Sequence, residues 1–312
     1  MRYTVPLFAA ILLSPSVTYA QSDDENPTFF RKKASEWMDI LRKDKSVRER
    51  RKALLALRFC GPQSRNIFES VTQAMLNDKE AIVRVQAAQV LNRLGTRARE
   101  RSDKLPITLA LKGLITAIEK DKDTEVRAAA AIALGRLGSL REDQRDDEIN
   151  AELKKAVPVL AKALTDETPT TRAAVAETLG RLGEMSKPAI KDLNAALKAS
   201  SDPKMVNARL FILYAIRRVG KPESLEAVNP LLETLKEKDL KPEVIRNIAE
   251  TLGRMGEGAS SASTALAPLM NHSDVDVKRT AAEALDRIGR GAKKVLPQLI
   301  TVVKSTTQDR LV

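Results

Sequence analysis

The chain has 312 residues and a formal net charge of +12 at pH 7, and 43% of its residues are hydrophobic while only 3% are aromatic. An apolar content of alanine, leucine, valine and isoleucine favours thin layers of helix on helix over a β-sandwich or a large ligand pocket. This length favours two domains or one extended repeat array. A single cysteine, Cys60, excludes a disulfide within the chain.

The first twenty residues, MRYTVPLFAAILLSPSVTYA, differ from the rest. A basic residue, Arg2, precedes a short apolar run over 5–13, and the segment ends in Thr18-Tyr19-Ala20, with small residues at positions 18 and 20. This pattern is typical of a secretory signal peptide cleaved after Ala20, and the run is too short for a membrane span, which needs about 20 residues. We therefore expect export to the periplasm or the medium, with disordered segments at 21–27 and 307–312.

A repeat begins after this segment. The octapeptide AETLGRLG at 176–183 returns as AETLGRMG at 249–256. Each closes on a glycine that belongs to a regular series. The series is Gly61, Gly95, Gly138, Gly183, Gly220, Gly256 and Gly289. A fixed feature every 33 to 45 residues predicts seven structural repeats.

Two further markers keep the same register. An anchor arginine stands eleven residues before the glycine, and in four repeats an aspartate stands about six residues earlier. The arginines are Arg50, Arg84, Arg127, Arg172 and Arg209, and the aspartates are Asp44, Asp78, Asp121 and Asp166. In the last two repeats Ile245 and Lys278 replace the arginine.

Each repeat is predicted to be a helical hairpin. Residues 125–138, EVRAAAAIALGRLG, place their aliphatic side chains on one side of a helix, and a second helix precedes them in each repeat, as over 151–166. A proline recurs inside several first helices, at Pro158, Pro230, Pro268 and Pro297, and predicts a built-in bend. One hairpin buries too little apolar surface to offset its conformational entropy, so the hairpins must stack.

These hairpins resemble HEAT repeats, most closely the bacterial subclass also found in phycobilin lyases. The resemblance rests on the aspartate at the turn, the VR that opens the second helix and the AAxALGxLG that ends it. It implies an all-α, right-handed α-solenoid of about seven hairpins over 28–306, with a capping helix at 290–306. It also implies that the aspartates and arginines above form a structural ladder between successive repeats, irregular towards the C-terminus.

The resemblance further implies that the second helices line a concave face. A helical wheel points the residues one, four, five and eight positions after the anchor away from the core. The candidates for binding a protein partner among them are Arg58, Ile132, Leu210, Leu213, Tyr214 and Arg217. Outward-facing Leu210, Leu213 and Tyr214 favour a contact patch, unless the curve of the stack buries them.

Six repeats also carry an arginine two residues before the glycine. These are Arg93, Arg136, Arg181, Arg218, Arg254 and Arg287. They form either a row that binds anions or a set of stems that pack over the next repeat, and packing is the preferred interpretation.

Catalysis finds little support in the sequence. His272 is the only histidine and falls at a turn, and no glycine-rich phosphate loop occurs. We expect no metal and no cofactor. The preferred function is a non-enzymatic, exported scaffold that binds a protein. The alternatives are a nucleic-acid or polyanion-binding groove like that of HEAT-like DNA glycosylases, which acidic Glu177, Glu250 and Glu283 disfavour, and a repeat protein like a phycobilin lyase.

Two charged segments complete the sequence. The acidic stretch 139–150 is expected to be a solvated linker or a docking tag, and the basic stretch 31–52 a charged end cap or a contact for anionic lipid.

Overall fold

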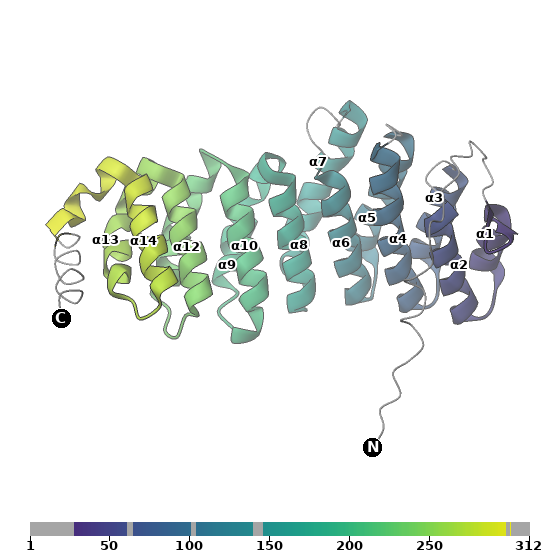
Figure 1. Ribbon diagram of the computed structural model, residues 1–312, viewed down its shortest axis with the longest axis horizontal. Helices are drawn as coiled ribbons and strands as arrows, with labels where there is room; N and C mark the ends of the chain where they lie inside the picture. The colour runs from purple at the N-terminus through teal and green to yellow at the C-terminus, as the bar shows by residue number, and fades with distance from the viewer. Residues whose placement is uncertain (1–27, 61–64, 101–103, 140–145, 298–299, 301–312) are drawn as a thin grey trace, which may run out of the picture.

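The computed structural model describes residues 28–60, 65–100, 104–139, 146–297 and 300. The predicted signal peptide, the segment 21–27 and the tail 307–312 lie outside this range. The described residues form a stack of helical hairpins that runs from the N-terminal to the C-terminal repeat (Figure 1). The prediction of an all-α solenoid is therefore confirmed.

The first four repeats each contain two helices. The pairs are α1 (Ala34–Lys43) and α2 (Val47–Cys60), α3 (Arg65–Asn77) and α4 (Ala81–Glu100), α5 (Lys104–Lys120) and α6 (Thr124–Gly138), and α7 (Asp147–Ala163) and α8 (Pro169–Leu182).

The last three repeats contain 3₁₀ turns as well. They comprise η3 (Gly183–Ala189), α9 (Ile190–Lys198), η4 (Pro203–Met205) and α10 (Val206–Val219); η5 (Glu223–Ala227), α11 (Val228–Leu235) and α12 (Pro242–Met255); and η6 (Gly256–Ala262), α13 (Ser263–Leu266), η7 (Ala267–Asn271) and α14 (Val275–Ile288). A final turn, η8 (Gly289–Val295), follows.

The helices form two layers. The second helices, α2, α4, α6, α8, α10, α12 and α14, stand side by side in Figure 1, and each contacts the next. The first helices form the other layer. One apolar cluster extends from Ala34 to Val295, so the repeats share a continuous core rather than separate globules. This arrangement follows from hairpins that cannot bury their flanks alone.

Side-chain and backbone caps begin and end the helices. The Asp123 carboxylate accepts hydrogen bonds from the backbone of Glu125 and Val126 at the start of α6, and Thr168 caps α8 ahead of Pro169. In the last repeats Gly183, Gly220, Gly256 and Gly289 end the second helices or follow them directly, with φ between 60° and 83°.

Gly95 departs from the expected role of a helix stop. Helix α4 continues past it to Glu100. A Cβ atom at position 95 would lie 2.1 Å from Leu137 Cδ2, so the missing side chain makes room for the next second helix. Gly95 marks the repeat as predicted, but a glycine is needed there for close packing against Leu137 and does not end the helix.

The two ends of the described chain add elements that the sequence analysis did not predict in this form. Residues 28–33 form a two-stranded antiparallel ribbon, β1 (Thr28–Phe29) and β2 (Lys32–Lys33), rather than part of a helical repeat. Trp37 Nε1 donates to the Phe29 carbonyl at 2.9 Å, and Phe29 stacks on Phe59. The ribbon thus packs against the first hairpin. At the other end, residues 290–295 of the predicted capping helix belong to the 3₁₀ turn η8, and residues 298, 299 and 301–306 lie outside the described residues.

Candidate protein-interaction surface

One exposed strip runs along the layer of second helices. In most repeats it consists of the residues one, five and nine positions after the anchor, which lie on one side of an α-helix. We call this strip the second-helix face. Four of the predicted binding residues, Ile132, Leu210, Tyr214 and Arg217, are half-buried on it or at its edge, and Arg58 is half-buried at the N-terminal end.

Leu213 does not belong to this face, and its prediction as an outward-facing residue is wrong. Its side chain is fully buried. The residue four positions after the anchor is also buried in five other repeats, as at Leu54 and Ala176, because it points at a neighbouring second helix. Ala282, in the last repeat, is only half-buried, since no further second helix of the described chain covers it.

The second helices approach one another closely at the residue eight positions after the anchor. A Cβ atom at Gly180 would lie 2.4 Å from the Tyr214 ring and 3.2 Å from the Ala215 Cα. At Gly253 the Cα of Ala284 would lie at 2.7 Å. These glycines let backbones approach each other, and Gly180 seats the Tyr214 ring against helix α8.

Charged side chains surround Tyr214. The Arg217 guanidinium lies 6.0 Å from the centre of the Tyr214 ring, and Glu250 on α12 bridges Arg217 and Arg254. Desolvation lowers the pKa of Arg217 below its ordinary value, against the opposing effect of Glu250. A partly buried, paired arginine beside an aromatic ring is a common feature of protein contact sites.

Three buried ion pairs join successive repeats at the turns within the hairpins. Arg50 Nε lies 2.6 Å from Asp78, and Arg84 and Arg127 lie 2.7 Å from Asp121 and Asp166. In each pair the hydrogen bond to the aspartate raises the pKa of the arginine.

Each of these arginines also donates to the carbonyl of the aspartate in its own repeat, as Arg84 does to Asp78 at 2.8 Å. The aspartates in turn accept backbone N–H groups, as Asp78 does from Glu80. These predicted residues therefore fix the angle between neighbouring hairpins.

Two residues assigned to the ladder make no such pair. The Asp44 side chain accepts the backbone N–H of Ser46, and its carbonyl accepts from Arg50. Arg172 donates to the Asp166 carbonyl, but within the described chain no acidic side chain pairs with it. In the next turn Asp202 stands seven residues before Arg209, one residue earlier than the ladder register of six, and its side chain caps η4. The ladder connection from Arg172 to the next repeat is therefore missing.

The arginines that precede the repeat glycines occupy the ninth position of the second-helix face. Arg93, Arg136, Arg218, Arg254 and Arg287 are exposed and Arg181 is half-buried. A Cβ atom at Gly135 would lie 3.2 Å from the Arg181 Cδ, so this stem packs over the preceding repeat rather than the next one. The half-buried Arg181 therefore shows the packing of the stem that was preferred, while the other five arginines are exposed.

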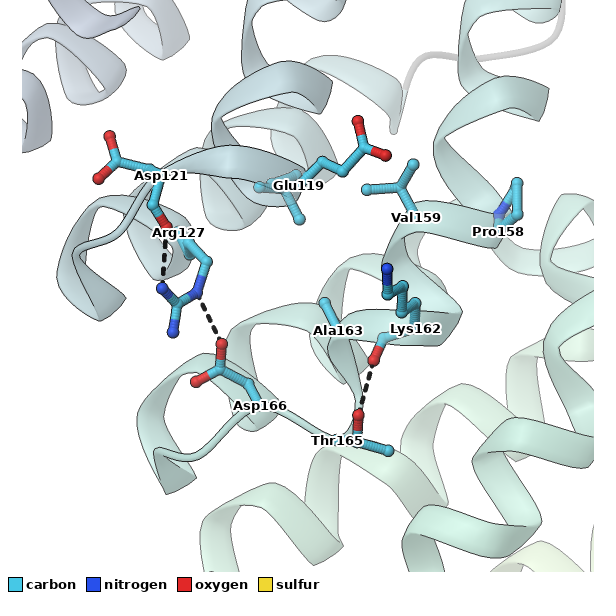
Figure 2. A pocket seen from close by; sticks show the side chains of 10 residues that line it. Glu119, Asp121, Arg127, Pro158, Val159, Lys162, Ala163, Thr165 and Asp166 are labelled. Carbon is cyan, nitrogen blue, oxygen red and sulfur yellow. Dashed lines mark hydrogen bonds and ion pairs between the residues drawn. The ribbon is translucent and has the colours of Figure 1, made fainter.

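A cavity of about 410 Å³ lies on the opposite layer, between the ends of α5 and α7 (Figure 2). Its charged floor is the paired Arg127 and Asp166, and Pro158 and Val159 line one side. Figure 2 shows Arg127 extending from the Asp121 carbonyl to Asp166, so these groups already bind one another. The charged groups that line the cavity are thus those of the ladder pair Arg127–Asp166.

His272 and Cys60 are the histidine and the cysteine of the described residues. His272 Nδ1 accepts the backbone N–H of Asp274 at a turn. Burial raises the pKa of the Cys60 thiol to about 11, so it is not a thiolate at neutral pH. No cluster of metal-ligating side chains occurs in the described part of the chain, and none of its helices has the length and hydrophobicity of a membrane span.

Comparison with known proteins identifies the repeat type. A family model described as HEAT repeats matches residues 111–210 and 228–312. No protein of curated function matches the sequence significantly.

Solved structures share the fold at low identity. Kap121p bound to Nup53p aligns with a TM-score of 0.58 and 16% identity over 88% of this chain and 31% of its own. A designed armadillo repeat protein in complex with the peptide (KR)4 gives 0.50 and 17%, over 81% of this chain and 98% of its own. The CpcE–CpcF complex of phycocyanin lyase from Nostoc gives only 0.43 and 20%, over 58% and 96%.

Proposed function

Because the chain belongs to the HEAT-repeat family, we propose that it is a non-enzymatic scaffold, exported through its N-terminal segment, that binds a protein partner along the second-helix face. One observation carries this proposal. Leu210, Tyr214 and Arg217 from α10 and Glu250 from α12 are half-buried and form a cluster of apolar, aromatic and charged side chains on the second-helix face.

The structural neighbours support a binding role without identifying a partner. Two solenoids of this fold were solved with a bound protein or peptide, Nup53p in one case and (KR)4 in the other. In a solenoid each repeat contributes one helix to a long surface, so a partner can contact many repeats at once.

Site-specific photo-crosslinking tests where the partner binds. A photoreactive side chain at Tyr214, on the second-helix face, is expected to capture a partner that mass spectrometry identifies. The matched control places the same group at Lys191, an exposed residue of α9 in the first-helix layer. Equal capture of the same protein from both positions would overturn the proposal.

Substitutions then separate binding from folding. The pair Leu210→Ser and Tyr214→Ser is expected to abolish capture of that partner and to leave the helical circular dichroism unchanged. Leu213→Ser is the contrasting variant, because it places a hydroxyl in a fully buried position and destabilises the fold itself. If the surface pair unfolds the protein as Leu213→Ser does, the face is part of the core and the proposal fails.

Export has its own test. The mature N-terminus of the protein purified from its source is expected to follow Ala20, as N-terminal sequencing would show. A start at Met1 in the cytoplasmic fraction would refute the exported part of the proposal.

A further inference from the structure

Repeat one differs from the other repeats at the ninth position of the second-helix face. That position holds an arginine in repeats two to seven, from Arg93 to Arg287, and Phe59 in repeat one. One turn earlier, at the fifth position, lies Leu55, of which 47% is exposed. Because residues four apart lie on the same side of a helix, these two side chains give the face an apolar end.

The N-terminal ribbon extends this apolar end. Phe29 stacks on Phe59 with the ring centres 5.1 Å apart, and Phe30 meets Phe29 edge to face at 4.4 Å. The hydrogen bond from Trp37 to the Phe29 carbonyl holds the ribbon on the first hairpin. Phe30, at the turn of the ribbon, is 75% exposed. Apolar side chains thus run from α2 to an exposed ring, and we call Phe30, Leu55 and Phe59 the terminal patch.

The turn of the ribbon holds two side chains in an unfavourable backbone conformation. The register of the strands leaves Phe30 and Arg31 as a two-residue loop, with φ of 49° and 62°. Such loops favour Asn-Gly, because a positive φ brings a Cβ atom close to the following carbonyl oxygen. The aromatic ring is therefore displayed at a steric cost, which the core does not require because the ring is exposed. Strained positions of this kind cluster at sites that bind other molecules.

Basic groups surround the terminal patch. Residues 31–33, with the sequence RKK, are exposed, and in the described part of the chain no acidic side chain forms an ion pair with them. The Arg58 guanidinium lies 5.4 Å from the centre of the Phe59 ring. The carboxylate of Glu36, on the first turn of α1, accepts the Lys33 backbone N–H at 2.7 Å. The surroundings of the patch therefore favour an acidic ligand.

Resting on the proposed protein-binding function, we propose that the terminal patch is a second contact for the partner, which contributes an apolar side chain flanked by carboxylates. The apolar side chain packs on Phe30 and Leu55, and the carboxylates pair with Arg31 and Lys32 through charge-assisted hydrogen bonds. Aromatic side chains and arginine together carry much of the binding energy of protein interfaces.

The patch and the Tyr214 cluster lie on the same face, four repeats apart. Packed helices lie about 8–10 Å apart, so the two sites are separated by about 30–40 Å along the stack. A partner that reaches both sites binds more tightly than it binds either one, because occupation of the first raises its effective concentration at the second.

An anionic lipid surface fits these residues less well. Lys43 and Lys45, which add to the charge of the basic stretch 31–52, lie at the far end of α1, about 15 Å from the ribbon. The charge is thus spread along the hairpin, whereas a lipid-binding site concentrates its basic residues in one cluster. Leu55 also continues the second-helix face, which a protein chain can follow from repeat to repeat.

A fluorescent peptide, Glu-Glu-Phe-Leu-Glu-Glu, tests the proposal by anisotropy at low salt. It is expected to bind the full-length mature protein, and raised ionic strength is expected to weaken binding. The control peptide Lys-Lys-Phe-Leu-Lys-Lys is expected to bind at least about tenfold more weakly. Equal binding of the two peptides, or no binding of the acidic one, would overturn the proposal.

The acidic residues that precede the ribbon, Asp23, Asp24 and Glu25, lie outside the described residues and offer a check on charge. Their replacement by the corresponding amides is expected to leave binding of the acidic peptide unchanged or to tighten it, since it removes negative charge near the patch. Weaker binding would contradict the assigned charge complementarity.

A variant that keeps the turn separates binding from folding. Phe30→Asn with Arg31→Gly supplies the preferred turn residues, so it should retain or raise the melting temperature and weaken peptide binding at least about tenfold. The matched control, Val275→Asn with Lys191→Ser, also removes one exposed apolar and one exposed basic side chain, far from the patch, and should leave the affinity within about twofold. Equal losses in both variants would refute the assignment.

Photo-crosslinking connects the patch to the proposed function. A photoreactive side chain at Leu55 is expected to capture the partner that Tyr214 captures, through a different segment in which carboxylates flank an apolar residue. Capture at Tyr214 with none at Leu55 would refute the second contact and leave the scaffold function standing.

Vesicles of phosphatidylglycerol and phosphatidylcholine test the lipid alternative. The protein is expected not to sediment with them. If it does, and Phe30→Asn with Arg31→Gly abolishes sedimentation while the acidic peptide fails to bind, the patch is a lipid contact and the proposal is wrong.

Discussion

Different structural features set the angle between neighbouring hairpins in the first four repeats and in the last three. In the first four, buried ion pairs join the turns within successive hairpins. In the last three, a glycine in the left-handed region stands at the end of the preceding second helix, and a 3₁₀ turn begins on it or within three residues of it. The two devices act at opposite ends of the second helices.

The physical reason lies in how the chain reverses direction. A residue with positive φ turns the chain without a loop, and glycine adopts it without the steric cost of a Cβ atom. Where a glycine sets the angle between two hairpins, an ion pair at the turns within those hairpins is less necessary. The last three repeats accordingly lack the aspartate–arginine pairs of the ladder. In repeat five Arg209 instead contacts Glu237 at 3.0 Å, and its Nε is unpaired.

The largest expected effect comes from breaking a buried ion pair of the N-terminal repeats. Asp121→Ala leaves the Arg84 guanidinium, of which 5% is exposed, without its carboxylate. An uncompensated buried charge costs about 3–5 kcal/mol, and urea unfolding followed by circular dichroism measures that loss.

Glu237→Ala is the matched change in the C-terminal repeats. Arg209 is as buried as Arg84, but Glu237 is 28% exposed and contacts Arg209 through Nη2 alone, whereas Arg84 makes two hydrogen bonds to Asp121. A half-solvated carboxylate contributes less than a buried one, so we expect a smaller loss, about 2 kcal/mol. Equal losses for the two variants would contradict the distinction between the two regions. The double variant Arg84→Met, Asp121→Leu should recover most of the stability lost in Asp121→Ala.

Much of this comparison could be predicted from the sequence, because it rests on fixed offsets. The aspartates and arginines at fixed offsets belong to the resemblance to HEAT repeats, which implies a contact between repeats, and Ile245 and Lys278 indicate its loss. The burial of Leu213 could not be predicted in the same way. A helical wheel describes one helix against one core, whereas a second helix also contacts its two neighbours, and those contacts narrow the exposed strip. Gly95 shows the same limit, since its role depends on Leu137 in the next repeat.

A smaller effect is expected from pH at the last pair of the ladder. Burial raises the pKa of Asp166, but hydrogen bonds from Arg127 and Thr168 outweigh burial, and its pKa lies below the ordinary value. A carboxyl whose pKa is lower in the folded state stabilises the fold above its unfolded pKa, about 3.9, and this contribution is lost as the pH falls through the folded pKa.

The stability difference between the unsubstituted protein and Asp166→Asn should therefore stay constant from pH 7 to about pH 5 and shrink below about pH 4. Urea midpoints at a series of pH values measure it. Asp276→Asn, at an exposed pair of α14, is the control and should change stability little at any pH. A difference for Asp166→Asn that grows on acidification would contradict the assigned direction.

The smallest expected change in stability comes from replacing a glycine with positive φ at the end of a second helix. Gly289 has a φ of +61° and no atom within 4 Å of the place where a Cβ would be, so a substitution there changes backbone strain without adding a clash. With a ψ of −122°, Gly289 lies far from the αL well that asparagine tolerates, so Gly289→Ala should destabilise the protein by about 1–3 kcal/mol and Gly289→Asn by a similar amount. Thermal unfolding monitored by circular dichroism compares the three proteins. If alanine is tolerated as well as glycine, the positive φ is not required, and the angle between α14 and η8 must come from side-chain packing instead.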